Sequence, residues 1–284
     1  MKGFLASRPF PRDVGWIIQG LPLDMTVSRL HGTASGPEAI RVESNKLENF
    51  SFSLEKDLRD ISFCDIGDLA LPKDDLNMAL EMIESVSRNF FDKGKRIASF
   101  GGEHLVTLPV VKAASNHYAD LAVIHIDAHA DLRDIYHGMK NNHATVMRRI
   151  AEDCLSTPKS LFQFGIRSGT REELEWGRAN TFLFPDRLIE PLRESIKIIG
   201  KRPVYLSLDI DAFDPGIAPG TGTPEPCGLG NRDFFESLAL MKDMHVIGFD
   251  IVEVSPPHDV NNITAVLAAK IARECLITWG GGNC

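Results

Sequence analysis

Three side chains that can bind a metal ion stand at alternate positions of one short segment: Asp127, His129 and Asp131. The segment directly follows the apolar run 121–124, so an extended backbone is expected there. In an extended backbone, alternate side chains point to the same face. The spacing therefore aims a carboxylate, an imidazole and a second carboxylate at one point. Carboxylates and imidazoles are common ligands of divalent metals.

The same arrangement of an apolar run followed by acids recurs in the segment 205–211, which ends in Asp209 and Asp211. His104 follows the apolar run 97–100, and Glu253 follows the run 246–252. In open parallel sheets, ligands bind outside the carboxyl ends of the strands. Four strand ends that deliver acids or histidines to one sheet edge predict a shared site.

The candidate metal ligands are four carboxylates and two imidazoles: His104, Asp127, His129, Asp131, Asp209 and Asp211. An oxygen-rich set with some nitrogen and no thiolate suits manganese, and suits magnesium or iron(II) less well. Structural zinc normally takes more cysteine or histidine. Two divalent ions about 3.5–4 Å apart can generate hydroxide at neutral pH and stabilise a developing anion. The predicted reaction class is hydrolysis.

Short apolar runs alternate with helix-like stretches along the chain, which indicates an α/β fold with right-handed crossovers. Several runs are apolar at successive residues, as in parallel strands covered on both faces. The expected strands are 15–19, 61–64, 97–100, 121–127, 161–165, 204–209 and 246–252. The expected helices include 37–42 with an extension, 76–93, 108–115, 145–152, 172–180, 232–241 and 263–279. We expect a long loop at 215–230 and a frayed end at 280–283.

Composition narrows the class of protein. The chain has 284 residues without a visible repeat or linker, so we expect a single domain over 1–284. A formal net charge of −8 argues against nucleic acid or an anionic membrane as partner and fits a small cationic substrate. Five cysteines with no zinc-binding spacing indicate reduced thiols in the cytoplasm. No apolar run reaches the roughly 18 residues of a membrane span, and a signal peptide is not expected.

The motifs together resemble those of the ureohydrolase family, which comprises arginases, agmatinases and their relatives. The resemblance extends over nearly the whole chain, and the segments 143–147 and 219–225 look most like those of agmatinases. The segments that carry the resemblance are Gly32-x-x-x-Gly36-Pro37-x-x-Ile40-Arg41, 101–104, 127–131, 143–145, 207–215, 219–225 and 250–256.

The resemblance implies a three-layer α/β/α fold with a central, mainly parallel sheet of eight strands. It also implies a centre of two Mn²⁺ ions and assembly into homotrimers or homohexamers. By the same resemblance, His104 and Asp131 bind one ion, and His129 and Asp211 bind the second. Asp127 and Asp209 bridge the two ions.

Three residues are expected to act on the substrate. Glu253 matches the acid that receives the guanidinium, and His143 matches a histidine at the mouth of the site. Asp131 is expected to pass a proton to the leaving amine, with help from His143. The expected reaction is the hydrolysis of agmatine to putrescine and urea. We interpret His125, inside its strand, as a core residue or one that lies behind the ligands.

Several alternatives stay open. Arginine, guanidinobutyrate or formiminoglutamate could be the substrate, and the segment Leu132–Asn142 is expected to carry the selectivity. That segment lacks the arginase-type pattern, which disfavours arginine. A binuclear phosphoesterase would show further Asn or His ligands. A metal-stabilised polyamine-binding protein would bind guanidines without releasing urea, but the complete ligand set argues against it.

Two residues depart from the agmatinase-like pattern. Cys227 stands where such sequences usually carry Gly, and Asn142 stands where they often carry Ser or Asp. Neither residue is a candidate ligand, but both belong to loops that are expected to face the substrate. These departures therefore affect the choice of substrate more than the reaction.

Overall fold

Eight parallel strands form the central sheet of the computed structural model, which describes residues 3–9 and 14–281. Their spatial order is β4-β1-β5-β10-β9-β6-β7-β8, and every neighbouring pair is parallel. The strands are β1 (Trp16–Leu21), β4 (Phe63–Asp68), β5 (Arg96–Gly101), β6 (Ala122–Ile126), β7 (Leu161–Ile166), β8 (Phe182–Pro185), β9 (Val204–Asp209) and β10 (Val246–Val252).

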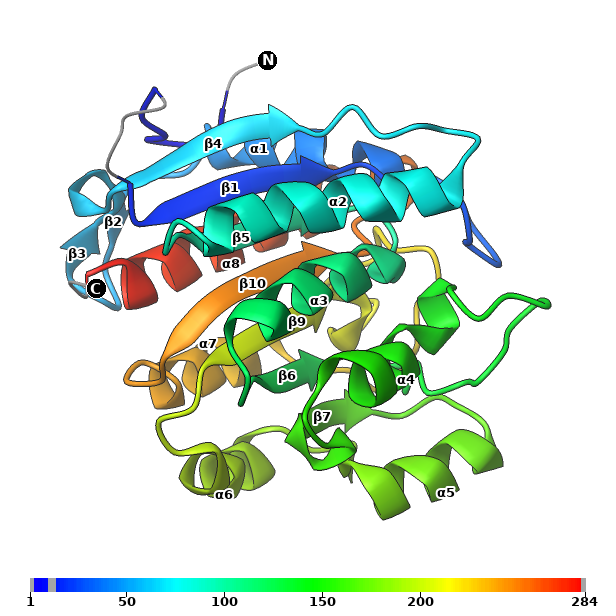
Figure 1. Ribbon diagram of the computed structural model, residues 1–284. Helices are drawn as coiled ribbons and strands as arrows, with labels where there is room; N and C mark the ends of the chain where they lie inside the picture. Colours follow the sequence, from blue (N-terminus) through cyan, green and yellow to red (C-terminus); the bar gives the residue numbers. More distant parts are fainter. Residues whose placement is uncertain (1–2, 10–13, 282–284) are drawn as a thin grey trace.

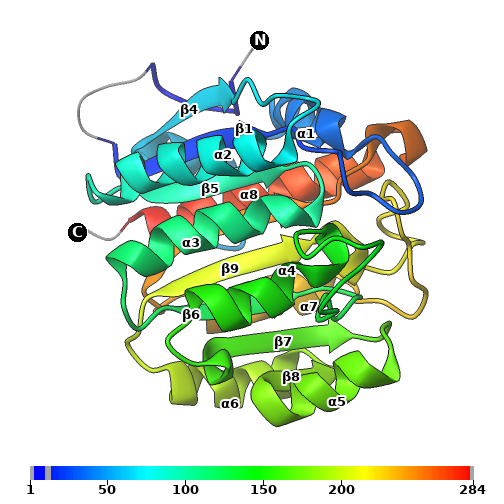
Figure 2. The ribbon, with the colours of Figure 1, turned by 45° about the vertical axis from the view of Figure 1, so that its right-hand side comes forward.

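Helices cover both faces of the sheet, as Figure 1 and Figure 2 show. One layer consists of α1 (Gly36–Ser44), α6 (Ile189–Ile199), α7 (Asn231–Leu240) and α8 (Ile263–Gly280). The other consists of α2 (Leu76–Phe91), α3 (Thr107–His117), α4 (Val146–Arg149) and α5 (Arg171–Asn180). The three-layer α/β/α fold expected from the sequence is thereby confirmed. None of the described helices is long and apolar enough to cross a membrane.

The continuous apolar runs reflect a core on each side of the sheet. In β1, Trp16 and Ile18 pack into the core beneath α1 and α8, whereas Ile17 and Leu21 pack beneath α2 and α3. All six residues of β1 are buried. Because successive side chains of a strand point to opposite faces, a strand covered on both sides is apolar at most positions, and the polar Gln19 of β1 is hydrogen-bonded to Ser87 and Ser99.

The seven expected strands and the seven expected helices all have counterparts, with shifted ends. The expected helix 145–152 is a short α4 followed by a π-helical turn, Ile150–Cys154. Three strands and one helix were not predicted: β8, α6 and the hairpin of β2 (Phe50–Ser51) and β3 (Lys56–Asp57). β8 is a four-residue edge strand that ends in a proline, so its apolar signal is short. Residues 282–283 of the expected frayed end, and Cys284, lie outside the described residues.

A glycine allows the segment after β1 to approach the end of β5. A Cβ at Gly102 would lie 1.9 Å from the carbonyl oxygen of Leu23, closer than any side-chain atom can come. The amide of Gly102 also donates to the carbonyl of Leu21 at 2.7 Å. Gly102 therefore lets the segment 22–28 lie directly against the residues that lead into His104.

A buried ion pair fixes α1 to the edge strand β4. The Arg41 guanidinium is 1% exposed and donates to both carboxylate oxygens of Asp65, at 2.7 Å and 3.0 Å. It also pairs with Asp68 at the end of the same strand. Such a fork-like, buried pair is geometrically specific, and removing one partner leaves a charge without compensation.

We expect Arg41→Met to lower the free energy of unfolding by about 3–5 kcal/mol, because the Asp65 carboxylate stays buried without its partner. Urea denaturation of the metal-free protein, followed by circular dichroism, measures the effect. Arg59→Met is the control, because Arg59 pairs with Asp57 at the surface and is 70% exposed. An unchanged midpoint for both variants would show that the buried pair contributes nothing to stability.

Candidate metal centre and substrate pocket

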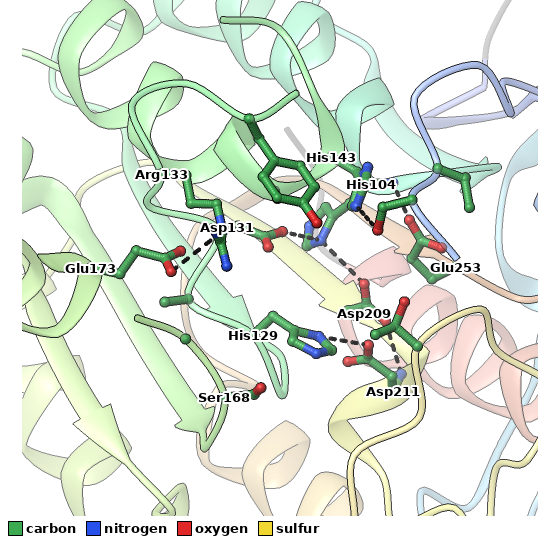
Figure 3. A pocket seen from close by; sticks show the side chains of 17 residues that line it. His104, His129, Asp131, Arg133, His143, Ser168, Glu173, Asp209, Asp211 and Glu253 are labelled. Atoms are coloured by element: carbon green, nitrogen blue, oxygen red, sulfur yellow. Dashed lines mark hydrogen bonds and ion pairs between the residues drawn. The ribbon is translucent and has the colours of Figure 1, made fainter. Parts of the chain in front are cut away.

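Four neighbouring strands deliver the candidate ligands to one edge of the sheet. β5, β10, β9 and β6 are adjacent, and the residues that follow them include His104, Glu253, Asp211 and Asp127. His104, Glu253 and Asp211 line a cavity of about 270 Å³. Figure 3 shows these three side chains around it. The sequence prediction that these strand ends meet is confirmed.

One imidazole nitrogen lies among three carboxylates. His104 Nδ1 is 3.1 Å from Asp127 Oδ2 and 3.2 Å from an oxygen of both Asp131 and Asp209. The nitrogen is buried and forms no hydrogen bond within the described part of the chain. Three negative oxygens around an unpaired ring nitrogen are the surroundings that a cation fills in a metal site.

A second group of ligand atoms adjoins the first and shares Asp127. His129 Nδ1 is 2.9 Å from Asp211 Oδ2 and 3.7 Å from Asp127 Oδ1. The ligand atoms of these three residues all lie within 4.8 Å of one another. The atoms of His104, His125, Asp127 and Asp131 form another such group. Two overlapping groups joined by one carboxylate fit a pair of metal ions.

The electrostatics of the cluster also fit bound cations. Burial raises the pKa of Asp131 to about 7 and that of Asp209 well above its usual range. Burial alone would lower the pKa of His129, but Asp211 and Asp127 outweigh it and raise that pKa to about 12. Without metal ions, protons must therefore compensate the crowded carboxylates. The oxygen-rich donor set without thiolate suits hard or borderline divalent ions.

Hydrogen bonds behind His104 orient its ring. His104 Nε2 is 3.0 Å from Ser207 Oγ, and the Ser207 hydroxyl donates to Asp250 at 2.7 Å. Asp250 also accepts from the hydroxyls of Tyr205 and Thr107, both at 2.9 Å. The Nε2 side of the imidazole is thus engaged, which leaves Nδ1 to face the carboxylates. Asp250, which the sequence analysis did not assign to the site, lies directly behind it.

Glu253 lines the same cavity from the end of β10. Its Oε1 accepts the backbone N–H of His104 at 2.8 Å, and its backbone has a φ of 63°. A positive φ is uncommon for a residue other than glycine and marks a constrained position. Burial raises the pKa of Glu253 to about 8. A buried carboxyl of this kind is poised to receive a cation.

His143 is held at the cavity by the segment 22–28. Its backbone N–H donates to the Thr26 hydroxyl at 3.0 Å, and its Nε2 is 3.3 Å from Ser28 Oγ. Asn142 donates its side-chain amide to the Thr26 carbonyl at 3.2 Å. Burial lowers the pKa of His143 to about 4, so its ring is neutral at neutral pH. Sequence reasoning did not identify Thr26 or Ser28.

The mouth of the cavity carries two residues from the segment Leu132–Asn142. The Arg133 guanidinium lies 4.6 Å from the centre of the Tyr136 ring, and Arg133 Nε is 3.7 Å from Glu173 Oε2. The Tyr136 ring meets the His143 ring edge-on at 5.9 Å. The expected selectivity segment therefore does line the pocket. Cys227 is exposed and is absent from the cavity lining.

Comparison with known proteins gives the family. The sequence profile of the arginase family matches residues 14–278. The chain belongs to the arginase family. The agmatinase of Bacillus subtilis (strain 168) is 42% identical over 279 residues, which cover 97% of this chain and 96% of that protein.

Solved structures of this arginase-family enzyme's relatives agree with its fold. The agmatine ureohydrolase of Thermoplasma volcanium has a TM-score of 0.88 and 32% identity, covering 98% of this chain and 94% of its own. The proclavaminate amidino hydrolase of Streptomyces clavuligerus has a TM-score of 0.91 and 31% identity, covering 99% of this chain and 97% of its own. The protein is thus a ureohydrolase, of a family that depends on two metal ions.

We expect metal binding to tighten as the pH rises from about 6 to about 8, because Asp131 and Asp209 must lose the protons that their raised pKa values retain. Calorimetric titration of the metal-free protein with Mn²⁺ measures this change. Parallel titrations in buffers of different ionisation enthalpy should show protons released on binding. Equal affinity at both pH values, without proton release, would contradict the expectation.

Proposed function

We propose that this enzyme hydrolyses agmatine to putrescine and urea. The observation that carries the proposal is the position of Glu253, a buried carboxyl that lines the cavity beside the His/Asp cluster. A guanidinium is a planar cation that a carboxylate can bind through two parallel hydrogen bonds. The name of the Bacillus subtilis relative, agmatinase, supports the same substrate.

Two Mn²⁺ ions are the proposed cofactors. His104 and Asp131 would hold one ion, His129 and Asp211 the other, with Asp127 and Asp209 between them. Contacts of His104 with three aspartates and of His129 with Asp211 support this division. When bound, such ions lower the pKa of water and stabilise the charge that develops as the guanidinium carbon is attacked.

Glu253 is proposed to hold and orient the guanidinium. Its carboxyl has a pKa of about 8, and an adjacent cation favours the ionised form, so substrate binding draws off the proton. The backbone N–H of His104 keeps Oε1 in place at 2.8 Å. The carboxylate therefore binds the substrate in one orientation and contributes charge-assisted hydrogen bonds.

Asp131 and His143 are proposed to move the protons. Asp131 is a buried member of the ligand group, with one carboxylate oxygen 3.2 Å from His104 Nδ1, and a carboxylate at this position can accept a proton and return it. His143 is neutral and lies at the cavity between Tyr136 and the segment 22–28. It can accept a proton from the site or donate one toward the leaving amine when protonated.

A guanidino acid such as guanidinobutyrate is the second candidate substrate. Arg133 lines the cavity with its side chain 37% exposed, and a guanidinium at that position would attract a carboxylate tail. Glu173 offsets part of this charge, since its carboxylate lies 3.7 Å from Arg133. The Arg133 guanidinium also lies over the Tyr136 ring, 4.6 Å from its centre, so that face of Tyr136 is already occupied by a cation.

The domain organisation, the cellular location and the assembly of the enzyme are proposed from its sequence. We infer that residues 1–284 form one catalytic domain, that the enzyme works in the cytoplasm, and that it assembles as a homotrimer or homohexamer. The absence of repeats or long linkers supports the first inference. The odd number of cysteines and the absence of a zinc-binding spacing support the second. The resemblance to the ureohydrolases supports the third.

We expect Glu253→Gln to lower kcat/KM for agmatine by about 10–100-fold, because the charge-assisted bonds to the guanidinium are lost. The amide oxygen can still accept the His104 N–H, so both metal ions should remain bound. Urea release and metal content by mass spectrometry measure the two quantities. Full activity in this variant would refute the proposed role, and loss of metal would move Glu253 into the metal centre.

We expect the Mn²⁺-loaded enzyme to release urea from agmatine faster than from arginine, guanidinobutyrate, guanidinopropionate or guanidine. The cavity then accepts a cationic tail without a carboxylate. Asp127→Ala is the inactive control, which should lose metal and activity together. Guanidinobutyrate as the best substrate would make Arg133 the tail partner. Failure to release urea from any compound, with two metals verified, would overturn the proposed function.

A further inference from the structure

His125 lies close enough to the candidate ligands to be mistaken for one of them. The residue is fully buried in β6, and its Nε2 is 2.7 Å from Asp127 Oδ2. Its ring also lies 5.2 Å from that of His104, within the same group of potential ligand atoms. Whether His125 binds metal depends on which of its ring nitrogens carries the hydrogen.

The neighbouring strand settles the position of that hydrogen. Gln163 stands opposite His125 in the register of β6 and β7 and is fully buried. Its Nε2 is 2.8 Å from the carbonyl oxygen of Ala130 and 3.1 Å from His125 Nδ1. A carbonyl can only accept, so the atom facing Ala130 must be the amide nitrogen. The second N–H of Gln163 then donates to His125 Nδ1.

The hydrogen-bond pattern leaves His125 no lone pair for a metal ion. Its Nδ1 accepts from Gln163, so its neutral ring carries the hydrogen on Nε2 and donates it to Asp127 Oδ2. The other oxygen of Asp127 accepts the backbone N–H of His129 at 2.6 Å. Each oxygen of Asp127 thus has one lone pair used by the protein and one free lone pair.

We propose that His125 and Gln163 are positioning residues that hold the Asp127 carboxylate in the orientation needed to bridge two metal ions, without binding metal themselves. The inference rests on the proposed role of Asp127 as a bridging ligand. Hydrogen-bond partners of metal ligands fix ligand orientation, and their loss typically weakens metal binding by about 10–100-fold.

The test measures Mn²⁺ affinity and stoichiometry in four variants. His125→Phe keeps a buried ring but removes the donor to Asp127, and His125→Gln keeps an amide N–H that can replace it. Gln163→Met removes, at similar volume, the two hydrogen bonds that the Gln163 amide donates and the one that it accepts from Thr181. Gln19→Met is the matched control, because Gln19 is also fully buried in the sheet and donates its amide to two groups, Ser87 and Ser99.

We expect His125→Phe to raise the Kd for Mn²⁺ by about 10–100-fold, and His125→Gln to restore most of that loss. Gln163→Met should raise the Kd by a smaller factor, whereas Gln19→Met should leave it unchanged even if both lower the thermal midpoint. Titration calorimetry gives the Kd, and electron paramagnetic resonance of Mn²⁺ distinguishes a coupled pair from a single ion. Two coupled ions should remain in wild type and in His125→Gln.

Three outcomes would overturn the inference. Wild-type affinity for Mn²⁺ in both His125→Phe and Gln163→Met would show that the hydrogen bonds from Gln163 to His125 and from His125 to Asp127 do not position Asp127. Loss of one ion in His125→Gln would make His125 a ligand. An equal change of Kd in Gln163→Met and Gln19→Met would show that the weaker binding reflects a general loss of stability and not the position of Asp127. If the wild-type protein itself binds no pair of Mn²⁺ ions, the metal assignment of the proposed function is wrong, and the positioning role of His125 and Gln163 is refuted with it.

Discussion

The crowding of carboxylates inside the protein is the constraint on which the rest of the structure depends. Oxygens of Asp127, Asp131 and Asp209 all lie within 3.2 Å of one imidazole nitrogen in a buried environment. Like charges at such spacing cannot all ionise without compensation, so protons or metal ions must be present. Four carboxylate ligands balance the charge of two divalent ions. The same crowding thus disfavours the metal-free site and makes metal binding favourable.

The parallel sheet meets this constraint by bringing rigid strand ends together. Because β5, β10, β9 and β6 are adjacent, residues distant in sequence arrive at one edge with little freedom left to lose. The chain then turns sharply at the site, where Asp131 and Glu253 have φ angles of 53° and 63°. Such backbone is costly for residues with a side chain, and the packed layers on both sides of the sheet hold it in place. The packing of the helical layers against the sheet therefore keeps the candidate ligands in fixed orientations.

The centre of the site and the segment Leu132–Asn142 in its lining could be predicted from sequence, but the contacts that hold them in place could not. The alternation of Asp127, His129 and Asp131 is local, and a strand end converts it directly into geometry. Thr26 acquires its role only by contacting His143, which is 117 residues away in the chain, and no local pattern marks such a contact. Gln163 reads as one polar residue in an apolar strand until the sheet register places it opposite His125. β8 escaped prediction because it is an edge strand of only four half-buried residues that ends in a proline.

The charge balance of the centre also explains why the substrate should be a cation. If metal ions compensate the four proposed ligand carboxylates, Glu253 is a buried acid of the cavity lining that can still receive the substrate. Burial raises its pKa to about 8, and a positive group beside the carboxyl favours the ionised form. A guanidinium stabilises the ionised form and gains charge-assisted hydrogen bonds, whereas a neutral amide leaves the acid protonated and gains neither. We infer that selection for the guanidinium arises at Glu253, whereas Arg133 and Tyr136 of the cavity lining act on the tail alone.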